Sequence, residues 1–498
     1  MNNQPKGLWY LSIGQAVAVL GNGLLQSLLI LYLTQSFHLH SHYAYQLNAA
    51  SYTMMGIASL ACGYVASRTC YVKALFGGEI LRVFAYILLA IGTLSSLKWS
   101  LAFFAIGQGF SFTVYLVLVG KLYSKKDKRR YTGFTISYLL MNISFIVSMA
   151  AGGYLVRYFG FHDTFLVAAF FIFISLLIYL AGLRYINKDN SSIMNLSRVA
   201  SLRSKKATTG SRKMAGFLLR KEPALQQWFV LAAFSIIGIP VAYLLFKYLN
   251  VMNILSYVAL VFVVLLWVYI AMKREKSSER QSLFVFLILA FFIVIWNGMY
   301  YLQTSLLTIF TEHNVNRMIF GHLVPPSSFS SVNAVYTILI SLTLVLVWHK
   351  LSQKNKSISI PAKFSFALIM MGVGWLLLTP VIYTAGAGKI NVIWIFITYL
   401  PQVLAGSILY PIGNALVGRL SPPHMEGPLM ATWQLLGQGM GAFLSGKLAL
   451  LAVIPEGQVA TSMTNPVYAK AFALIGVLGF AAAILCVVSR SLINRVLV

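Results

Sequence analysis

Acidic side chains are scarce in this sequence, which holds only 10 Asp and Glu residues among its 498. Charged residues of both signs make up 10%, against about 25% in a soluble globular domain, and hydrophobic residues reach 59%. The mean hydropathy is +0.79. These values exclude a soluble enzyme and a disordered chain. They predict an all-α protein built mainly of membrane-spanning helices, each of about 20 residues.

Cysteines and catalytic motifs are also missing. The 3 cysteines, Cys62, Cys70 and Cys486, are too scattered for a disulfide framework or a metal site. The chain has no nucleophile elbow, no HExxH zinc motif and no phosphate-binding glycine loop with its lysine. The absence of that loop argues against an ATP-driven pump. We therefore predict that the chain is not an enzyme and holds no cofactor.

Long apolar runs are what the sequence contains instead. Fourteen of them are long enough to cross a bilayer, and they lie near 8–36, 44–67, 74–97, 99–120, 132–156, 164–183, 225–246, 251–272, 282–311, 328–349, 364–386, 391–418, 427–453 and 468–489. The first run is too long for the core of a signal peptide and is not followed by a small-residue cleavage site. We expect it to be a retained helix.

A polar segment rich in Ser, Lys and Arg divides these runs into six and eight. This pattern predicts two six-helix bundles with two further helices inserted between them. A chain of fourteen independent helices is the alternative, but a break of this length favours bundles. The predicted parts are an N-terminal bundle at 1–183, a basic cytoplasmic linker at 184–222, an inserted hairpin with its exit loop at 223–280, and a C-terminal bundle at 281–498.

Basic residues are distributed unevenly between the two ends of the runs. Most of the 38 Lys and Arg, which give the chain a net charge of +28, lie in alternate gaps such as 121–130 and 184–222. The positive-inside rule assigns those gaps and both termini to the cytoplasmic side of a cell inner membrane. The charge excess thus indicates contact with the anionic lipid headgroups of the bilayer and not with nucleic acid.

One carboxylate lies well inside a predicted span. Glu79 stands about two turns into the run at 74–97, and Arg82 follows on the same helix face. Ionisable groups at this depth are costly and commonly mark functional sites. Two interpretations are open. The residues form either a coupling or gating pair that lines the N-terminal bundle, or a self-satisfied pair that holds the third helix against a neighbour.

Histidines alternate in the first predicted outer turn, at His38, His40 and His42. Such a run can bind a metal or sense the outside pH. No cysteine or acidic residue nearby supports that reading, so we expect an ordinary polar turn.

Uncharged polar and aromatic side chains interrupt several spans. Each one is more often an interhelical hydrogen-bonding group than a ligand contact, but together they could line a water-accessible cavity almost without charge. They are Gln15, Asn22, Gln26, Asn142, Trp296, Gln303, Asn333, Gln402, Trp433 and Gln434.

Sequence motifs in both halves suggest a family. The C-terminal half contains PPSSFSSVN at 325–333, YPIG at 410–413 and LSPP at 420–423, and the N-terminal half contains GFTISYLLMN at 133–142. In these motifs the chain resembles the proton-dependent oligopeptide transporter (POT) family of the major facilitator superfamily. The resemblance implies twelve core helices with an inserted pair, alternating access, and symport of di- or tripeptides. It also implies a peptide site lined by Asn142, Asn333 and Trp433.

The charged residues of that family are replaced in this chain. The first-helix Glu-x-x-Glu-Arg motif aligns with residues 15–19, which begin at Gln15, and the fourth-helix lysine aligns with Phe112. The seventh-helix glutamate, which follows Trp296 by four residues, is Tyr300, and the tenth-helix glutamate is Gly406. A zwitterionic peptide needs a partner for each buried charge. Neither partner is present at its usual position.

We therefore predict a divergent secondary-active transporter that moves di- or tripeptides, or a related and less charged small organic solute, by alternating access, with altered or absent proton coupling. The predicted substrate-binding residues are Asn142, Asn333, Trp433, Trp296, Tyr300 and Gln15. Glu79 and Arg82 are the candidates for coupling or gating. The alternative is a non-transporting membrane receptor or interaction protein on a retained transporter fold.

Overall fold

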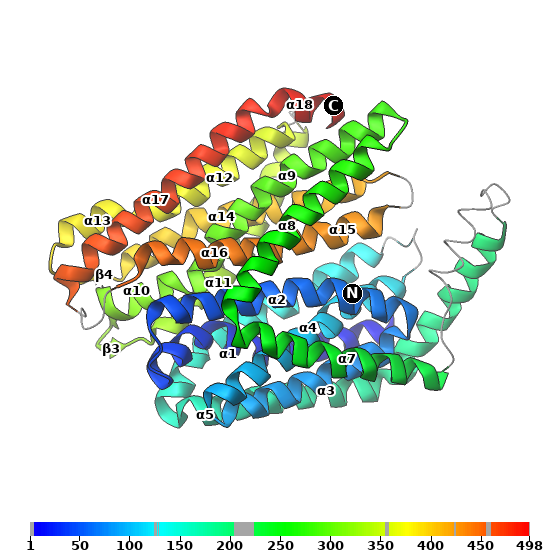
Figure 1. Ribbon diagram of the computed structural model, residues 1–498, viewed down its shortest axis with the longest axis horizontal. Coiled ribbons are helices and arrows are strands. Elements are labelled where there is room, and N and C mark those ends of the chain that lie inside the picture. The colour runs from blue at the N-terminus through cyan, green and yellow to red at the C-terminus, as the bar shows by residue number, and fades with distance from the viewer. Residues whose placement is uncertain are drawn as a thin grey trace. The chain divides into compact units, whose positions relative to one another are not determined.

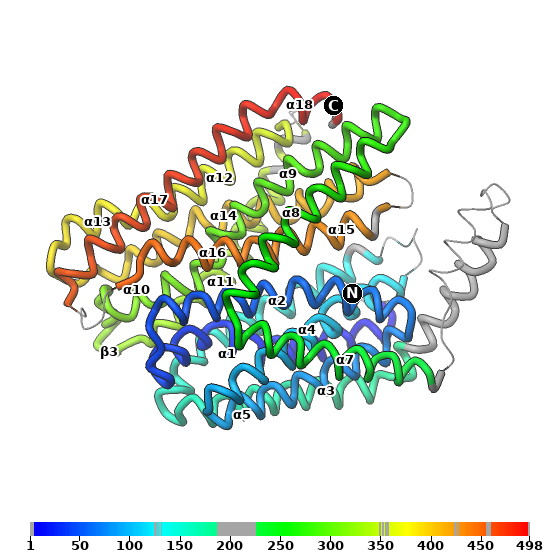
Figure 2. The backbone as a smooth tube through the Cα atoms, in the orientation of Figure 1, coloured from blue at the N-terminus to red at the C-terminus, as the bar shows by residue number. Residues whose placement is uncertain are grey.

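The computed structural model describes residues 4–123, 127, 129–203, 224–353, 358–422, 425–454 and 460–497 (Figures 1 and 2). Helices account for nearly all regular structure within these residues, and the strands are only two residues long. The chain divides into two compact units, which are described separately below.

The first unit consists of Met1–Leu25, Ile57–Ser148 and Leu155–Lys247. Its helices are most of α1 (Lys6–Leu31), the second part of α2 (Ser41–Arg68), α3 (Tyr71–Ala90), α4 (Leu94–Lys121), most of α5 (Arg129–Arg203) and α7 (Ala224–Lys247). A capping box begins α4. The Thr93 hydroxyl accepts a hydrogen bond from the Ser96 backbone N–H, and the Ser96 hydroxyl accepts one from the Thr93 backbone N–H, so two backbone donors at the helix start are satisfied.

The second unit consists of Gln26–Gly56, Met149–Tyr154 and Tyr248–Val498. Its α-helices after residue 248 are α8 (Leu249–Met272), α9 (Ser277–Tyr301), α10 (Leu306–Asn314), α11 (Ser330–Gln353), α12 (Ile360–Leu376), α13 (Leu378–Ala385), α14 (Ile393–Leu420), α15 (Glu426–Gln434), α16 (Gly441–Ala449), α17 (Thr461–Val488) and α18 (Arg490–Leu497). Short irregular segments also belong to this unit. They are the π-helical η1 (Tyr32–Ser36), which continues α1, the π-helical η4 (Leu435–Met440), and the 3₁₀ turns η2 (Leu302–Thr304), η3 (Pro326–Phe329) and η5 (Leu450–Ala452).

Four short strands lie in the loops of the second unit. β1 (Val315–Asn316) pairs in parallel with β4 (Ile390–Asn391), and β2 (Met318–Ile319) pairs antiparallel with β3 (His322–Leu323). Arg317 secures the β2–β3 hairpin by donating from Nη1 to the carbonyl of Val324 at 3.0 Å. Burial lowers the pKa of the Arg317 guanidinium below its usual value.

Twelve helical segments in the described residues are long and apolar enough to cross a bilayer. One of them, Thr132–Ile186, is 55 residues long and contains a break in helical geometry at Gly160, whose φ is 80°. α3 is not among the twelve, and it carries three charged residues, Lys73, Glu79 and Arg82. The large exposed side chains of such helices, for example Phe229 and Ile236 on α7, are those expected on a lipid-facing surface.

Glycines allow two helix pairs to pack backbone to backbone. On α3 and α4, a Cβ atom added at Gly78 would lie 2.8 Å from the carbonyl oxygen of Gly107. On α12 and α17, which run side by side in Figure 1, a Cβ atom at Gly479 would lie 2.8 Å from the Cα atom of Gly372. Residues with larger side chains would force these helices apart.

Candidate functional site

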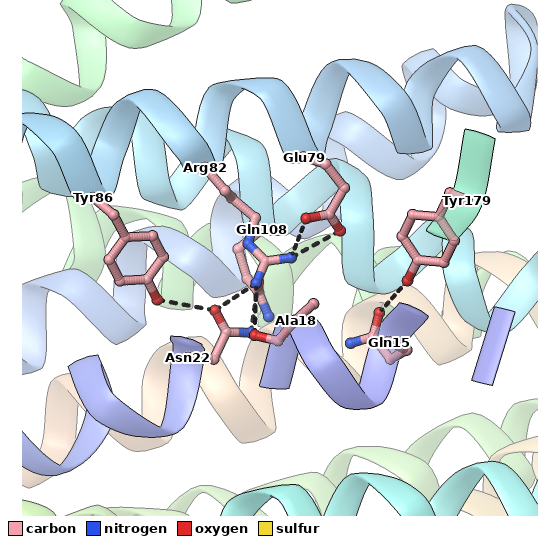
Figure 3. A network of polar contacts seen from close by, with 8 residues as sticks. All are labelled: Gln15, Ala18, Asn22, Glu79, Arg82, Tyr86, Gln108 and Tyr179. Atoms are coloured by element: carbon pink, nitrogen blue, oxygen red, sulfur yellow. Dashed lines mark hydrogen bonds and ion pairs between the residues drawn. The ribbon is translucent and has the colours of Figure 1, made fainter. Parts of the chain in front are cut away.

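The two charged residues of α3 form an ion pair in the interior of the first unit (Figure 3). Both side chains are 0% exposed. Arg82 donates from Nη1 to both carboxylate oxygens of Glu79, each at 2.9 Å. The spacing of three residues places both groups on one helix face, as the sequence predicts. The guanidinium neutralises the carboxylate, so this part of the bundle contains opposite charges without a net charge.

Neutral groups from α1 and α4 complete the surroundings of Arg82. Its Nη2 donates to Asn22 Oδ1 at 2.6 Å and to the carbonyl of Ala18 at 3.4 Å. The same Asn22 oxygen accepts a hydrogen bond from the Tyr86 hydroxyl at 3.1 Å, while Asn22 Nδ2 donates to Gln108 Oε1 at 3.3 Å. A charge-assisted bond of this kind is stronger than a neutral one. The ion pair thereby links three helices through Asn22.

A second buried contact lies along α1 next to this network. The Tyr179 hydroxyl, from the second part of α5, donates to Gln15 Oε1 at 3.2 Å. Tyr179 also lies within electrostatic reach of Glu79, and Figure 3 shows the two side chains on neighbouring elements. Gln15 Nε2 has no hydrogen-bond partner among the described residues. Gln15 thus stands beside the charged pair with one donor unused.

A chain of amides connects three elements of the second unit. Asn333 on α11 donates from Nδ2 to Gln303 Oε1 at 2.6 Å, and Gln303 in η2 donates from Nε2 to Gln402 Oε1 on α14 at 2.7 Å. Gln303 and Gln402 are buried, whereas Asn333 is partly exposed. The Nε2 atom of Gln402 has no partner in the described part of the chain. These hydrogen bonds orient the Asn333 side chain, whose Nδ2 donates to Gln303 within the second unit.

Two aromatic residues of α9 face α14. The rings of Trp296 and Tyr300 stack with centroids 5.3 Å apart and planes 25° apart. A Cβ atom added at Gly406 would lie 3.2 Å from Cζ2 of Trp296. The indole therefore occupies the space next to the position where the family pattern has a glutamate. Its Nε1 donor has no partner among the described residues.

The remaining predicted site residues have separate contacts. Trp433 on α15 packs on Gly413, where an added Cβ would lie 2.5 Å from Cζ2 of the indole, and its ring centroid is 6.0 Å from that of Phe286. Asn142 on α5 belongs to the first unit and donates to the carbonyl of Tyr138 in its own helix at 2.8 Å. The structure thus groups Gln15 with Glu79 and Arg82 in one unit, and Trp296, Tyr300 and Asn333 around α14 in the other.

Several partners of these residues lie outside the predicted substrate-binding set, although Asn22, Gln303 and Gln402 are among the polar side chains that the sequence singles out. The partners are Asn22, Tyr86, Gln108, Tyr179, Gln303 and Gln402. Asn22, Gln303 and Gln402 carry a usable signal, because each is a polar amide inside an apolar run. Tyr86 and Tyr179 carry none, since tyrosine is common in such runs and only their packing shows the hydrogen bonds.

The outer histidine run forms no cluster of this kind. His42 contacts Gln46 through its ring nitrogen Nε2 at 3.3 Å, and His38 has a positive φ of 50°. In the part of the chain that the structure describes, no group of three or more His, Cys, Asp and Glu residues is arranged to hold a metal ion.

Comparison with known proteins identifies the family. The model of the POT family matches residues 72–464, which is most of the chain. The chain belongs to the POT family. It is thus a membrane transporter of the proton-dependent oligopeptide type and not an enzyme, as its motifs predict.

Curated relatives of this POT protein match over most of their length. It is 26% identical to dipeptide and tripeptide permease B of Xenorhabdus bovienii, over 84% of this chain and 81% of that protein. It is 24% identical to dipeptide and tripeptide permease B of Photorhabdus luminescens, over 99% of this chain and 97% of the relative.

Solved structures confirm the fold. A crystal structure of a peptide transporter POT bound to sulfate superposes with a TM-score of 0.82 at 19% identity, covering 100% of this chain and 96% of the other. A POT family transporter bound to 5-aminolevulinic acid gives a TM-score of 0.80 at 20% identity, covering 99% and 98%. The protein therefore has the all-α, multi-pass membrane fold of these POT transporters.

Proposed function

We propose that this protein is a secondary-active transporter that moves di- or tripeptides, or a related small organic solute, by alternating access. The observation that carries the proposal is the end-to-end match to a dipeptide and tripeptide permease, which spans 99% of this chain and 97% of the relative. The direct test is uptake and counterflow in proteoliposomes, after a thermal-shift screen of peptides, amino acids and small organic ions has found a solute that binds.

The proposed architecture has fourteen spans. The 55-residue segment Thr132–Ile186 accounts for two of them, one on each side of Gly160. α3 is a further span, although its charged residues keep it out of the twelve apolar segments. Two six-helix bundles, with α7 and α8 inserted between them, fit this count. The basic gaps then support a cell inner membrane location with both termini in the cytoplasm. Residues 204–222 of the predicted linker 184–222 lie outside the described residues.

The proposed solute site is nearly uncharged. Gln15, Asn142, Trp296, Tyr300, Asn333 and Trp433 are its proposed lining residues. Support comes from the donors of Gln15 and Trp296, which have no partner among the described residues, and from the absence of a carboxylate at Gly406. A solute with amide or carbonyl acceptors suits such donors better than a free ammonium group, which needs acceptors or an anion.

Asn333→Ala is expected to lower solute uptake at normal surface expression, because it removes the amide that Gln303 orients. The matched control is Thr343→Ala on the same helix, since the exposed Thr343 hydroxyl donates to the carbonyl of Leu339 one turn earlier. Initial uptake rates in proteoliposomes with equal protein content measure the effect. Equal rates for the wild type and Asn333→Ala would remove Asn333 from the site.

Glu79 and Arg82 are proposed as the coupling or gating pair. Glu79→Gln is expected to abolish the dependence of uptake on a proton gradient while counterflow continues, because the amide cannot bind and release a proton. Asp127→Asn is the control, since that carboxylate pairs with Arg129 outside the spans. If uptake by Glu79→Gln responds to the proton gradient as uptake by the wild type does, the pair has only a structural role.

A non-transporting receptor or interaction protein is the second candidate. The observation that favours it is the replacement of the family's charged positions by Gln15, Phe112, Tyr300 and Gly406. Reconstituted protein that binds a solute in the thermal-shift screen but moves none of it would support this reading.

A further inference from the structure

One basic side chain lies inside a long apolar segment without an acidic partner. Lys447 on α16 belongs to the segment Pro428–Ala452, which is long and apolar enough to cross a bilayer. Its side chain is only partly exposed, and it forms no salt bridge with any residue that the structure describes. A charged group at such a depth is costly and commonly marks a functional site.

Two aromatic rings hold the Lys447 ammonium in place. Its Nζ atom lies 5.3 Å from the ring centroid of Phe443, one turn earlier on α16, and 5.8 Å from that of Tyr257 on α8. The two rings meet edge to face, with centroids 4.8 Å apart and planes 87° apart. The face of an aromatic ring attracts a cation but carries no net charge. The rings therefore position the ammonium and leave its charge without a counter-ion.

A small, partly open hollow lies beside Lys447 between α2, α8 and α16, and it has room for about one water molecule. Its polar lining consists of Gln46, Thr53, Asn253, Ser256 and Lys447. α2 and α16 nearly touch along one side of it, where a Cβ atom added at Gly446 would lie 2.6 Å from Cβ of Ala49. All the residues that line the hollow belong to the second unit.

Most hydrogen-bond donors of the hollow already have acceptors. Thr53 and Ser256 each donate to a backbone carbonyl one turn earlier in their own helix, at 2.9 and 2.8 Å. Gln46 Nε2 contacts a histidine ring of its own helix at 3.3 Å. The amide of Asn253 has no hydrogen-bond partner in the described part of the chain. The ammonium of Lys447 and the amide of Asn253 thus remain as donors, which suits an oxyanion.

The exposed face of α8 beside the hollow is apolar. Ile254, Val258 and Phe262 follow one another at intervals of four residues, so they lie on one side of the helix, and each is more than half exposed. In the proposed topology α8 begins at the outer side of the membrane. Lys447 lies five residues before Ala452, the end of its segment, which is about 7.5 Å along a helix. A lysine side chain at this depth can reach the lipid headgroups.

We propose that Lys447 and Asn253 bind the phosphate group of a phospholipid from the outer leaflet. One phosphate oxygen occupies the hollow and accepts hydrogen bonds from the ammonium and the amide, and the acyl chains lie along the exposed face of α8. Charge complementarity supports this occupant, since a phospholipid combines the anion that Lys447 needs with chains that cover an apolar face. The site rests on the proposed membrane orientation and does not depend on transport.

Native mass spectrometry of the purified full-length protein in detergent tests the site, with dioleoyl phosphatidylglycerol as the added lipid. Lys447→Gln removes the charge, and Asn253→Ala removes the amide. We expect the first lipid to bind about tenfold more weakly to each variant than to the wild type, because each loses a hydrogen bond to a charged group. Asn253→Ala keeps the lysine and its ring contacts, so it carries the test if Lys447→Gln does not fold.

Lys470→Gln is the matched control. Lys470 is an exposed lysine on α17, inside another apolar segment, and it contacts no aromatic ring among the described residues. Its replacement should leave the affinity for the first lipid unchanged. Lys447→Arg keeps the positive charge and should retain most of the binding. Equal affinity of the wild type, Lys447→Gln and Asn253→Ala for phosphatidylglycerol would overturn the site.

Two further ligands separate a lipid from a free anion. Dioleoylglycerol, which has the chains without the phosphate, should bind the wild type and Lys447→Gln equally. Inorganic phosphate at millimolar concentration should not displace phosphatidylglycerol. Displacement by inorganic phosphate would show a site for a small free anion and contradict the lipid, and so would an affinity for dioleoylglycerol that depends on Lys447. The measurement uses no solute, so its result is independent of the transport assays.

Discussion

Arg82→Met is expected to cost about 3–5 kcal/mol of folding free energy, because it leaves the Glu79 carboxylate buried without its ionic partner. Both side chains are 0% exposed, and Arg82 supplies two hydrogen bonds to that carboxylate. Thermal unfolding of the purified protein in detergent measures the loss. Arg129→Met is the control, since exposed ion pairs such as that with Asp127 contribute little.

Removing both charges together is expected to restore the stability. In Glu79→Leu/Arg82→Met no unpaired charge remains, and apolar replacement of a buried ion pair is commonly neutral or stabilising. A double variant that is as unstable as Arg82→Met would show that the energy lies in the contacts of Arg82 with Asn22 and not in the charge pairing.

The same double variant separates the two interpretations of the pair. If the pair only holds α3 in place, a stable double variant transports with the same response to a proton gradient as the wild type. If the pair couples transport to protons, the stable double variant loses that response. Stability and transport measured on one sample therefore distinguish a pair that only holds α3 in place from a pair that couples transport to protons.

Gly78→Ala is expected to destabilise the first unit by about 1–3 kcal/mol, because the added methyl group overpacks the contact between α3 and α4. The new Cβ atom would lie 2.8 Å from the carbonyl oxygen of Gly107 and 2.9 Å from Cβ of Phe110. Both neighbours belong to α4, and a backbone oxygen cannot rotate away. The helices must separate beside Glu79, so we also expect transport to fall.

The neighbouring glycine is the matched control. A Cβ atom at Gly77 would meet nothing within 4 Å, so Gly77→Ala is expected to be neutral or slightly stabilising through better helix propensity. Melting temperatures of the two variants, purified side by side, measure the difference. Equal shifts would contradict the close approach of α3 and α4 at Gly78.

Class, spans and family were predictable from the sequence because each depends on local information. Hydropathy summed over about 20 residues reports a span without any knowledge of its neighbours. The pairing of Glu79 with Arg82 was predictable for the same reason, since residues three apart share a helix face. The count of fourteen spans stays a prediction, since twelve described segments are long and apolar enough: α3 carries three charges, and Thr132–Ile186 forms one segment across Gly160.

The sequence by itself determined a multi-pass α-helical transporter of the POT family with one acidic and basic pair inside an apolar run. Only the tertiary structure decided that Asn22 supports Arg82 and that Gln303 joins Asn333 to Gln402. These contacts join residues that are far apart in the chain. Their formation depends on the rotation and depth of each helix against its neighbours, which apolar runs of similar composition do not encode locally.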